Sequence, residues 1–127
     1  MQEAADSILH GLRHGLEDIG EKVLAFSHIS RAYNTGASLY FTYIFRIAPG
    51  ADETLSRWKK LKDTACKAIL AHGGTISHQH GVGADHLPYL EAEKGELGMQ
   101  ALATLARTFD PERIMNPGKL IDGRKQD

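Results

Sequence analysis

The side chains best suited to chemistry gather in one glycine-rich stretch, residues 73–83, which reads GGTISHQHGVG. Two histidines in it, His78 and His80, are separated by one residue, so in extended backbone both imidazoles project to the same side. A histidine can take or give a proton near neutral pH, and two neighbouring imidazoles shift each other's equilibrium, which suits acid–base catalysis. The flanking glycines would let a planar ligand or substrate approach the backbone closely.

Other interpretations of this stretch stay open. A bare His-x-His pattern is more often one exposed histidine beside one that hydrogen-bonds a carbonyl group. The glycines of 81–83 could begin a dinucleotide fingerprint, but His86 stands where the third glycine belongs and no long helix is expected directly after them. They could also form a nest of N–H groups for a phosphate, assisted by Lys94 or Arg46. A zinc site would draw on His72, His78, His80, His86 and Asp85, at a spacing that matches no common zinc pattern.

A second polar group lies on the predicted strand 38–47. Alternation along this strand puts aromatic and aliphatic residues on one face, and Tyr40, Thr42 and Arg46 on the other. A phenol on that second face either packs with its hydroxyl satisfied at an edge or meets a ligand. The one cysteine, Cys66, lies in mid-helix, where nothing local lowers its pKa, so we predict a packing residue.

Hydrophobic periodicity predicts the elements that position these side chains. Helices are expected over residues 4–19, from Asp52 to Gly73-Gly74, and over 96–109; strands are expected over 22–28, 38–47 and 75–78. This order resembles a ferredoxin-like βαββαβ unit. We therefore predict an α+β fold with an antiparallel sheet that carries helices on one face, lacks its first strand, and is followed by a C-terminal helix.

Composition limits the classes of function. The 127 residues suit one domain, and 42% hydrophobic with 24% charged residues is typical of folded globular proteins. Fifteen basic against sixteen acidic residues give a net charge of −1, which disfavours a nucleic-acid partner. No apolar run approaches the ~20 residues that span a bilayer. With a single cysteine and no targeting signal, we expect no membrane partner and a cytoplasmic location.

Three motifs together resemble a known family. Residues 33–41 read YNTGASLYF, residues 73–83 carry the histidines, and residues 110–120 read DPERIMNPGKL. In this order and spacing they are similar to the C-terminal part of FAD-linked oxidases of the vanillyl-alcohol-oxidase type. The closest resemblance is to the alkyldihydroxyacetonephosphate synthases and their bacterial relatives, and it covers most of the chain from about Val23 onward.

The resemblance implies a longer protein, in which an N-terminal domain holds most of the FAD and a C-terminal cap supplies substrate-side residues over the flavin ring. Residues 1–127 would be the last part of that cap, without the FAD-binding domain. By position, Tyr40 resembles the active-site tyrosine of the family, and His78 and His80 resemble the outer members of its histidine triplet. Gln79 replaces the middle histidine of the synthases. This departure counts against the ether-forming reaction and leaves flavin-linked oxidation of a hydroxy substrate open.

The resemblance also implies further site residues. Asn116 and Lys119 lie in the terminal motif, which in the family returns toward the flavin-binding domain, so we expect both near the cofactor. Arg46 and Gln79 are expected to contact substrate. Related 2-hydroxy-acid dehydrogenases hold a metal with two histidines near the positions of His28 and Thr35; since the second is threonine here, we expect no metal.

We therefore predict the substrate-side cap of an FAD-dependent oxidoreductase that acts on a hydroxy acid or a glycerone-phosphate-like substrate. The chain alone should be inactive, and its expected partners are the FAD-binding domain of the same protein and a small-molecule substrate. A homodimer is also conceivable. The alternative is a free-standing ferredoxin-like module that dimerises through an edge strand without catalysis, and a third hypothesis is a small metallohydrolase.

Overall fold

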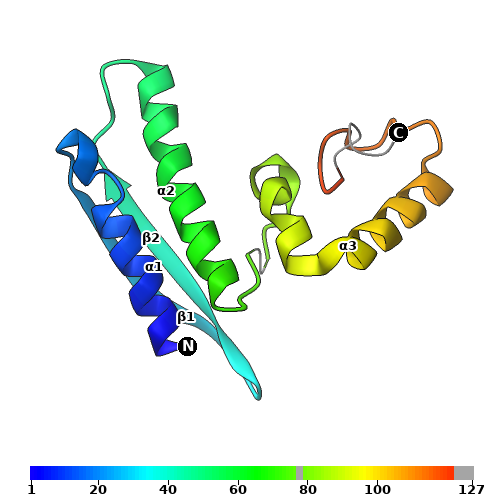
Figure 1. The fold of residues 1–127 in the computed structure, drawn as a ribbon, viewed down its shortest axis with the longest axis horizontal. Helices are drawn as coiled ribbons and strands as arrows, with labels where there is room; N and C mark the ends of the chain where they lie inside the picture. Colours follow the sequence, from blue (N-terminus) through cyan, green and yellow to red (C-terminus); the bar gives the residue numbers. More distant parts are fainter. Residues whose placement is uncertain (77–78, 122–127) are drawn as a thin grey trace. The chain divides into compact units, whose positions relative to one another are not determined.

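The computed structural model describes residues 1–76 and 79–121. The chain divides into two compact units, Met1–Gly74 and Thr75–Asp127, which we describe separately. The elements are α1 (Gln2–His14), the short 3-10 helix η1 (Glu17–Ile19), β1 (Val23–Tyr33), β2 (Gly36–Phe45), α2 (Ala51–Ala71) and α3 (Gly83–Phe109) (Figure 1). Helices combined with an antiparallel sheet confirm the predicted α+β class. No helix among the described residues is both long and apolar enough to cross a membrane.

The two strands of the first unit form an antiparallel hairpin closed by a tight turn at Asn34-Thr35. Alternation along β1 buries Val23 and Ala25, while Leu24 and Phe26 face outward. The strand runs beyond the predicted 22–28, because its pairing with β2 continues past the last buried residue to the turn. One face of the sheet is therefore in the core and the other is open.

Helices α1 and α2 pack together over the inner face of the sheet (Figure 1). The buried core consists of Ile8, Leu12, Leu16, Val23, Ala25 and Leu61. Gly11 and Gly15, which weaken helix propensity, allow this packing: an added Cβ at Gly15 would lie 2.7 Å from Leu61 Cδ2, and one at Gly11 would lie 2.8 Å from Thr64 Cγ2. Helix α1 ends at His14, so the single helix expected over 4–19 is interrupted before η1.

A buried arginine joins three parts of this unit. The Arg57 guanidinium, on α2, donates hydrogen bonds to Glu53 Oε1 at 2.7 Å, to Glu21 Oε1 at 3.2 Å and to the Arg46 carbonyl oxygen at 2.9 Å. Glu21 precedes β1 and Arg46 follows β2, so the guanidinium ties both ends of the hairpin to the helix. No local sequence pattern indicates such a contact between distant residues.

The second unit contains a longer helix than the sequence predicts. Helix α3 begins at Gly83 rather than at Glu96, and Gly95, with φ 71° and ψ 168°, divides it at a kink. Only the part after the kink was expected. The sequence does not predict the helical turns before the kink, because proline and glycine are poor helix formers and Pro88 and several glycines lie there.

Two expectations about residues 75–86 change with this helix. A helix does follow the glycines of 81–83, so the argument that none follows was wrong; the missing third glycine still counts against a dinucleotide fingerprint. The short strand expected over 75–78 is not formed at Thr75 and Ile76, which are irregular. Ser77 and His78 lie outside the described residues.

Candidate functional site

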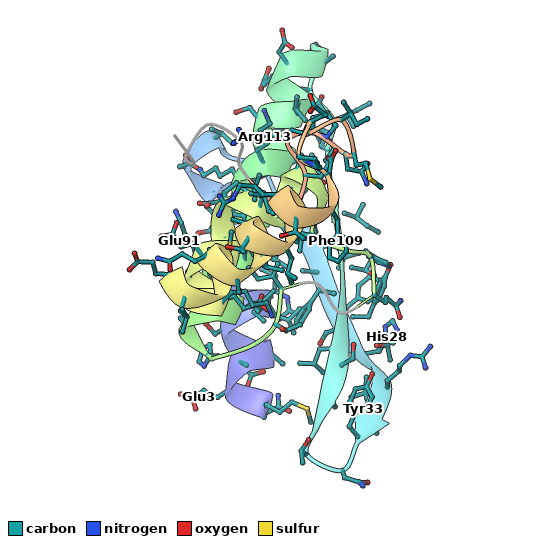
Figure 2. All side chains as sticks on the ribbon, turned by 90° about the vertical axis from the view of Figure 1, so that its right-hand side faces the viewer. Glu3, His28, Tyr33, Glu91, Phe109 and Arg113 are labelled. Carbon is teal, nitrogen blue, oxygen red and sulfur yellow. The ribbon has the colours of Figure 1, made fainter. Side chains whose placement is uncertain are left out.

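Tyr40 stands on the open face of the sheet. It is 43% exposed and lies opposite His28 in the register of β1 and β2. The two rings are stacked, with centroids 5.3 Å apart and an interplanar angle of 26°. Figure 2 shows the His28 side chain projecting outward from the hairpin. The phenol is thus open to solvent rather than sealed in the core, and its ring is stacked on a neighbouring ring.

The surroundings of this ring pair are apolar. Three successive cross-strand pairs form what we call the outer sheet face: Leu24 with Ile44, Phe26 with Thr42, and His28 with Tyr40. Leu24 is 61% exposed and Ile44 57%. Contiguous exposed apolar side chains of this kind mark a surface that binds a ligand or another polypeptide.

Arg46 follows the end of β2, with an 80% exposed side chain whose Nε lies 4.0 Å from Glu21 Oε2. Six residues of extended chain place its Cα about 20 Å from that of Tyr40. Only an elongated substrate could therefore contact both side chains. The expectation that Arg46 binds substrate stays a prediction.

The described part of the histidine stretch is exposed and surrounded by unusual glycine conformations. Gln79 and His80 are both exposed. Gly81 and Gly83 have φ values of 71° and 58°, and no atom lies within 4 Å of the position that a Cβ would take at either residue. Positive φ favours glycine, and the open space leaves this backbone accessible. His78, the other predicted catalytic histidine, lies outside the described residues.

Glu93, on α3, binds two residues in the first part of the histidine stretch, ahead of the histidines. Its Oε1 accepts a hydrogen bond from Thr75 Oγ1 at 2.8 Å and lies 2.7 Å from Lys94 Nζ, and its Oε2 accepts one from the Ile76 N–H at 3.0 Å. Burial raises the pKa of Glu93, but the hydrogen bonds from Lys94, Ile76 and Thr75 outweigh this and lower the pKa below its ordinary value. Sequence analysis missed Glu93, because its partners lie 17 and 18 residues away.

The predicted cofactor-binding residues share one exposed turn. Asn116 has φ 46°, and its carbonyl oxygen accepts a hydrogen bond from the Lys119 N–H at 3.2 Å. The Asp110 carboxylate accepts hydrogen bonds from the N–H groups of Ile114 and Met115, which stabilises the turn that precedes it. The side chains of Asn116 and Lys119 are both open to solvent. Their approach to a cofactor stays a prediction.

The described residues contain neither a cluster of metal ligands nor an exposed thiol. Within residues 1–76 and 79–121, no three His, Cys, Asp or Glu side chains are grouped so that they could hold a metal ion. Cys66 is buried on α2, and burial raises the pKa of its thiol, so the prediction of a packing residue is confirmed.

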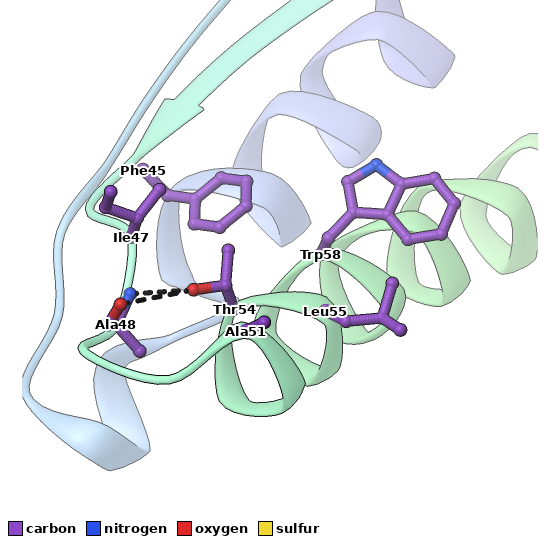
Figure 3. Close-up of a pocket in the computed structure, with 7 residues that line it drawn as sticks. All are labelled: Phe45, Ile47, Ala48, Ala51, Thr54, Leu55 and Trp58. Atoms are coloured by element: carbon purple, nitrogen blue, oxygen red, sulfur yellow. Dashed lines mark hydrogen bonds between the residues drawn. The ribbon is translucent and has the colours of Figure 1, made fainter.

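An apolar hollow lies between the end of β2 and the start of α2 (Figure 3). Its lining consists of Phe45, Ile47, Ala48, Ala51, Thr54, Leu55 and Trp58. Thr54 Oγ1 accepts a hydrogen bond from the Ala48 N–H at 2.9 Å, so this polar group is already engaged. Since no lining side chain titrates, the hollow offers contact area but no acid–base chemistry.

Comparison with known proteins gives consistent matches. A family model described as FAD linked oxidases, C-terminal domain, matches residues 3–120. The alkyldihydroxyacetonephosphate synthase of Trypanosoma brucei brucei is 37% identical over 95 residues, which cover 74% of this chain and 15% of that protein. The synthase of Dictyostelium discoideum is 32% identical over 111 residues, 87% of this chain and 18% of that protein.

A relative with a different printed activity is also similar. The mitochondrial D-lactate dehydrogenase (cytochrome) of Arabidopsis thaliana is 37% identical over 73 residues, which cover 58% of this chain and 13% of that protein. The chain therefore spans less than a fifth of the length of each of these three relatives.

Proposed function

The chain belongs to the family of FAD-linked oxidase C-terminal domains, and from this premise we propose that it forms the substrate side of the active site of an FAD-dependent oxidoreductase. The substrate would be a hydroxy acid or a glycerone-phosphate-like compound. The observation that carries the proposal is the exposed phenol of Tyr40, stacked on His28 within the otherwise apolar outer sheet face. Such a surface suits a flat ring system beside a small polar substrate.

The residues present fit the flavin end of FAD, the cofactor of this family. In the first unit, Phe26 and the His28–Tyr40 pair offer exposed ring surface. In the second unit, taken by itself, the open backbone at Gly81 and Gly83 permits close approach of a planar group. We assign most other contacts with FAD to an N-terminal domain of the full-length protein. When bound, FAD would act as the electron acceptor that takes a hydride from the hydroxyl-bearing carbon of the substrate.

The residues of this chain would manage the substrate and its proton. Oxidation of a hydroxyl-bearing carbon leaves a hydroxyl proton that needs a base, and the exposed imidazole of His80 is a group of the right type to accept it. For Tyr40 we propose a hydrogen bond from the phenol to the substrate oxygen, which would hold that oxygen in place. His78, which the motif pairs with His80, stays part of the prediction.

Gln79 bears on the choice of substrate. An amide both donates and accepts hydrogen bonds but does not take up a proton near neutral pH. Where the resemblance implies a third imidazole in the synthases, this chain offers only a neutral hydrogen-bonding group. We therefore favour oxidation of a 2-hydroxy acid over the synthase reaction.

The test uses the full-length protein with FAD and a panel of 2-hydroxy acids. His80→Gln should slow flavin reduction by about 100-fold or more, the size expected when a positioned acid–base group is lost. Tyr40→Phe should also slow it, because the substrate oxygen loses a hydrogen bond that holds it in place. Tyr33→Phe makes the same chemical change at the turn end of the same hairpin and should leave the rate unchanged. Flavin reduction at the normal rate in both Tyr40→Phe and His80→Gln would reject the proposal.

A further inference from the structure

We propose that Glu93 is a positioning residue for His80: its carboxylate fixes the backbone at Ile76, four residues before His80, so that the imidazole is held between two anchor points on α3. This inference rests on the proposed function, in which His80 handles the substrate proton. It adds a residue that neither the motifs nor the family description assigns.

The first anchor is the carboxylate itself. Both of its oxygens are used, because Thr75 and Lys94 approach Oε1 while the Ile76 N–H approaches Oε2. A carboxylate held through both oxygens by separate donors cannot rotate without losing a hydrogen bond. Bonds from an N–H group to an ionised oxygen are also about twice as strong as neutral ones. The backbone at Ile76 is therefore tied to α3.

The burial of Glu93 indicates that this contact is more than a surface ion pair. Its side chain is only 13% exposed, whereas glutamate is rarely buried unless it is paired. The hydrogen bonds that lower the pKa of Glu93 against the effect of burial keep it ionised near neutral pH, the form that accepts from every donor around it. An exposed carboxylate in contact with solvent would not define the chain's path in this way.

The second anchor is the first turn of α3. The His86 N–H donates to the Val82 carbonyl oxygen at 3.2 Å, where the helix starts. Glu93 follows Gly83 by ten residues, about 15 Å along the part of the helix that precedes the kink at Gly95. The short connection that carries His80 is thus attached at both ends to one helical segment. Attachment at both ends removes conformations that the imidazole would otherwise sample.

Replacement of Glu93 by glutamine isolates this effect. Glutamine keeps the shape, but it is neutral: it loses the ion pair with Lys94, and it offers the Ile76 N–H no ionised acceptor. The hold on the Ile76 backbone should then weaken while α3 stays helical. A base displaced by about 1 Å can lower the rate about 100-fold. We expect kcat to fall about 10- to 100-fold, with a much smaller change in KM.

The experiment uses the full-length protein with FAD and reads hydrogen–deuterium exchange at the Ile76 amide together with kcat and KM for a 2-hydroxy acid. Glu93→Gln should speed exchange at Ile76 and lower kcat. Thr75→Val removes only one of the hydrogen bonds and should have the same effects at smaller size, which keeps the test available if Glu93→Gln fails to fold. Glu96→Gln removes the same charge from an exposed position on α3 and should behave as wild type.

Unchanged exchange at Ile76 in Glu93→Gln would overturn the inference, and so would faster exchange with unchanged kcat. His80→Gln separates either failure from that of the proposed function. If His80→Gln lowers kcat and Glu93→Gln does not, only the positioning role fails. If neither substitution lowers kcat, the role of the histidine stretch in the reaction fails as well.

Discussion

The chemically reactive side chains of this chain differ in how far they are open to solvent. Tyr40 and His80 are exposed on irregular or open surfaces, whereas Cys66 is 3% exposed on α2. Burial disfavours the charged thiolate and raises the pKa of the Cys66 thiol, although the nearby Lys62 acts in the opposite direction. The exposed groups are therefore candidates for chemistry, and the buried thiol contributes to packing.

This difference predicts a dependence of stability on pH. Because the folded thiol has a raised pKa, its contribution to stability is fully present below the ordinary thiol pKa and is lost as pH rises through the folded value. Cys66→Ala lacks this titration. In urea unfolding between neutral and alkaline pH, wild type should lose stability relative to Cys66→Ala only on the alkaline side. A constant difference between the two proteins across that range would contradict the effect of burial.

At the scale of the elements, Gly11 on α1 and Gly15 directly after it set the distance between α1 and α2. An added Cβ at Gly15 would also lie 3.0 Å from the Gly11 carbonyl oxygen, part of the backbone, which cannot move aside as a side chain can. We expect Gly15→Ala to destabilise the protein by about 1–3 kcal/mol, the usual cost of overpacking a core. Gly36→Ala, where the added methyl group meets open space, is the control.

The comparison is made by thermal or urea unfolding of the two variants and wild type. Gly15→Ala should unfold at lower temperature or lower urea, and Gly36→Ala should stay close to wild type. Equal stability of all three would mean that α1 can move away from Leu61 without cost, which the buried packing of that side chain argues against.

The elements also divide into those that sequence predicts and those that it does not. Helix α2 and the hairpin were predictable, because their apolar residues repeat at the period of a helix or a strand and Gly73-Gly74 follows the helix. The first half of α3 was not, because Gly83, Pro88 and Gly95 hide its periodicity. A local hydrophobic pattern therefore predicts the helices and strands that bury one continuous apolar face.

The same limit applies to the candidate site. Tyr40 was found from its motif and from strand alternation, but its stacking on His28 depends on the register that the turn imposes between two strands. The hydrogen bond between Glu93 and the Ile76 N–H joins residues that are far apart in the sequence, and no local pattern predicts it. Candidate site residues can thus be chosen from sequence, while the contacts around them follow only from the fold.

At the scale of the whole molecule, the outer sheet face is the most distinctive exposed surface of the first unit. It is apolar on a sheet of only two strands, so each strand also has an outer edge without a partner strand among the described residues. Exposed apolar faces and strand edges favour association with another chain. In the full-length protein we assign this face to the flavin and the substrate.

The isolated 127-residue chain should therefore self-associate through the outer sheet face as concentration rises. Phe26→Lys places a charge in the middle of that face and should shift sedimentation equilibrium toward the monomer, because a buried lysine in a contact between copies would be desolvated. Leu97→Lys changes an 80% exposed apolar residue on α3 and should leave the association unchanged. Equal association of wild type and Phe26→Lys would mean that the outer sheet face takes no part in the association. A wild-type chain that stays monomeric at every concentration would contradict the prediction and show that this apolar surface is tolerated in water.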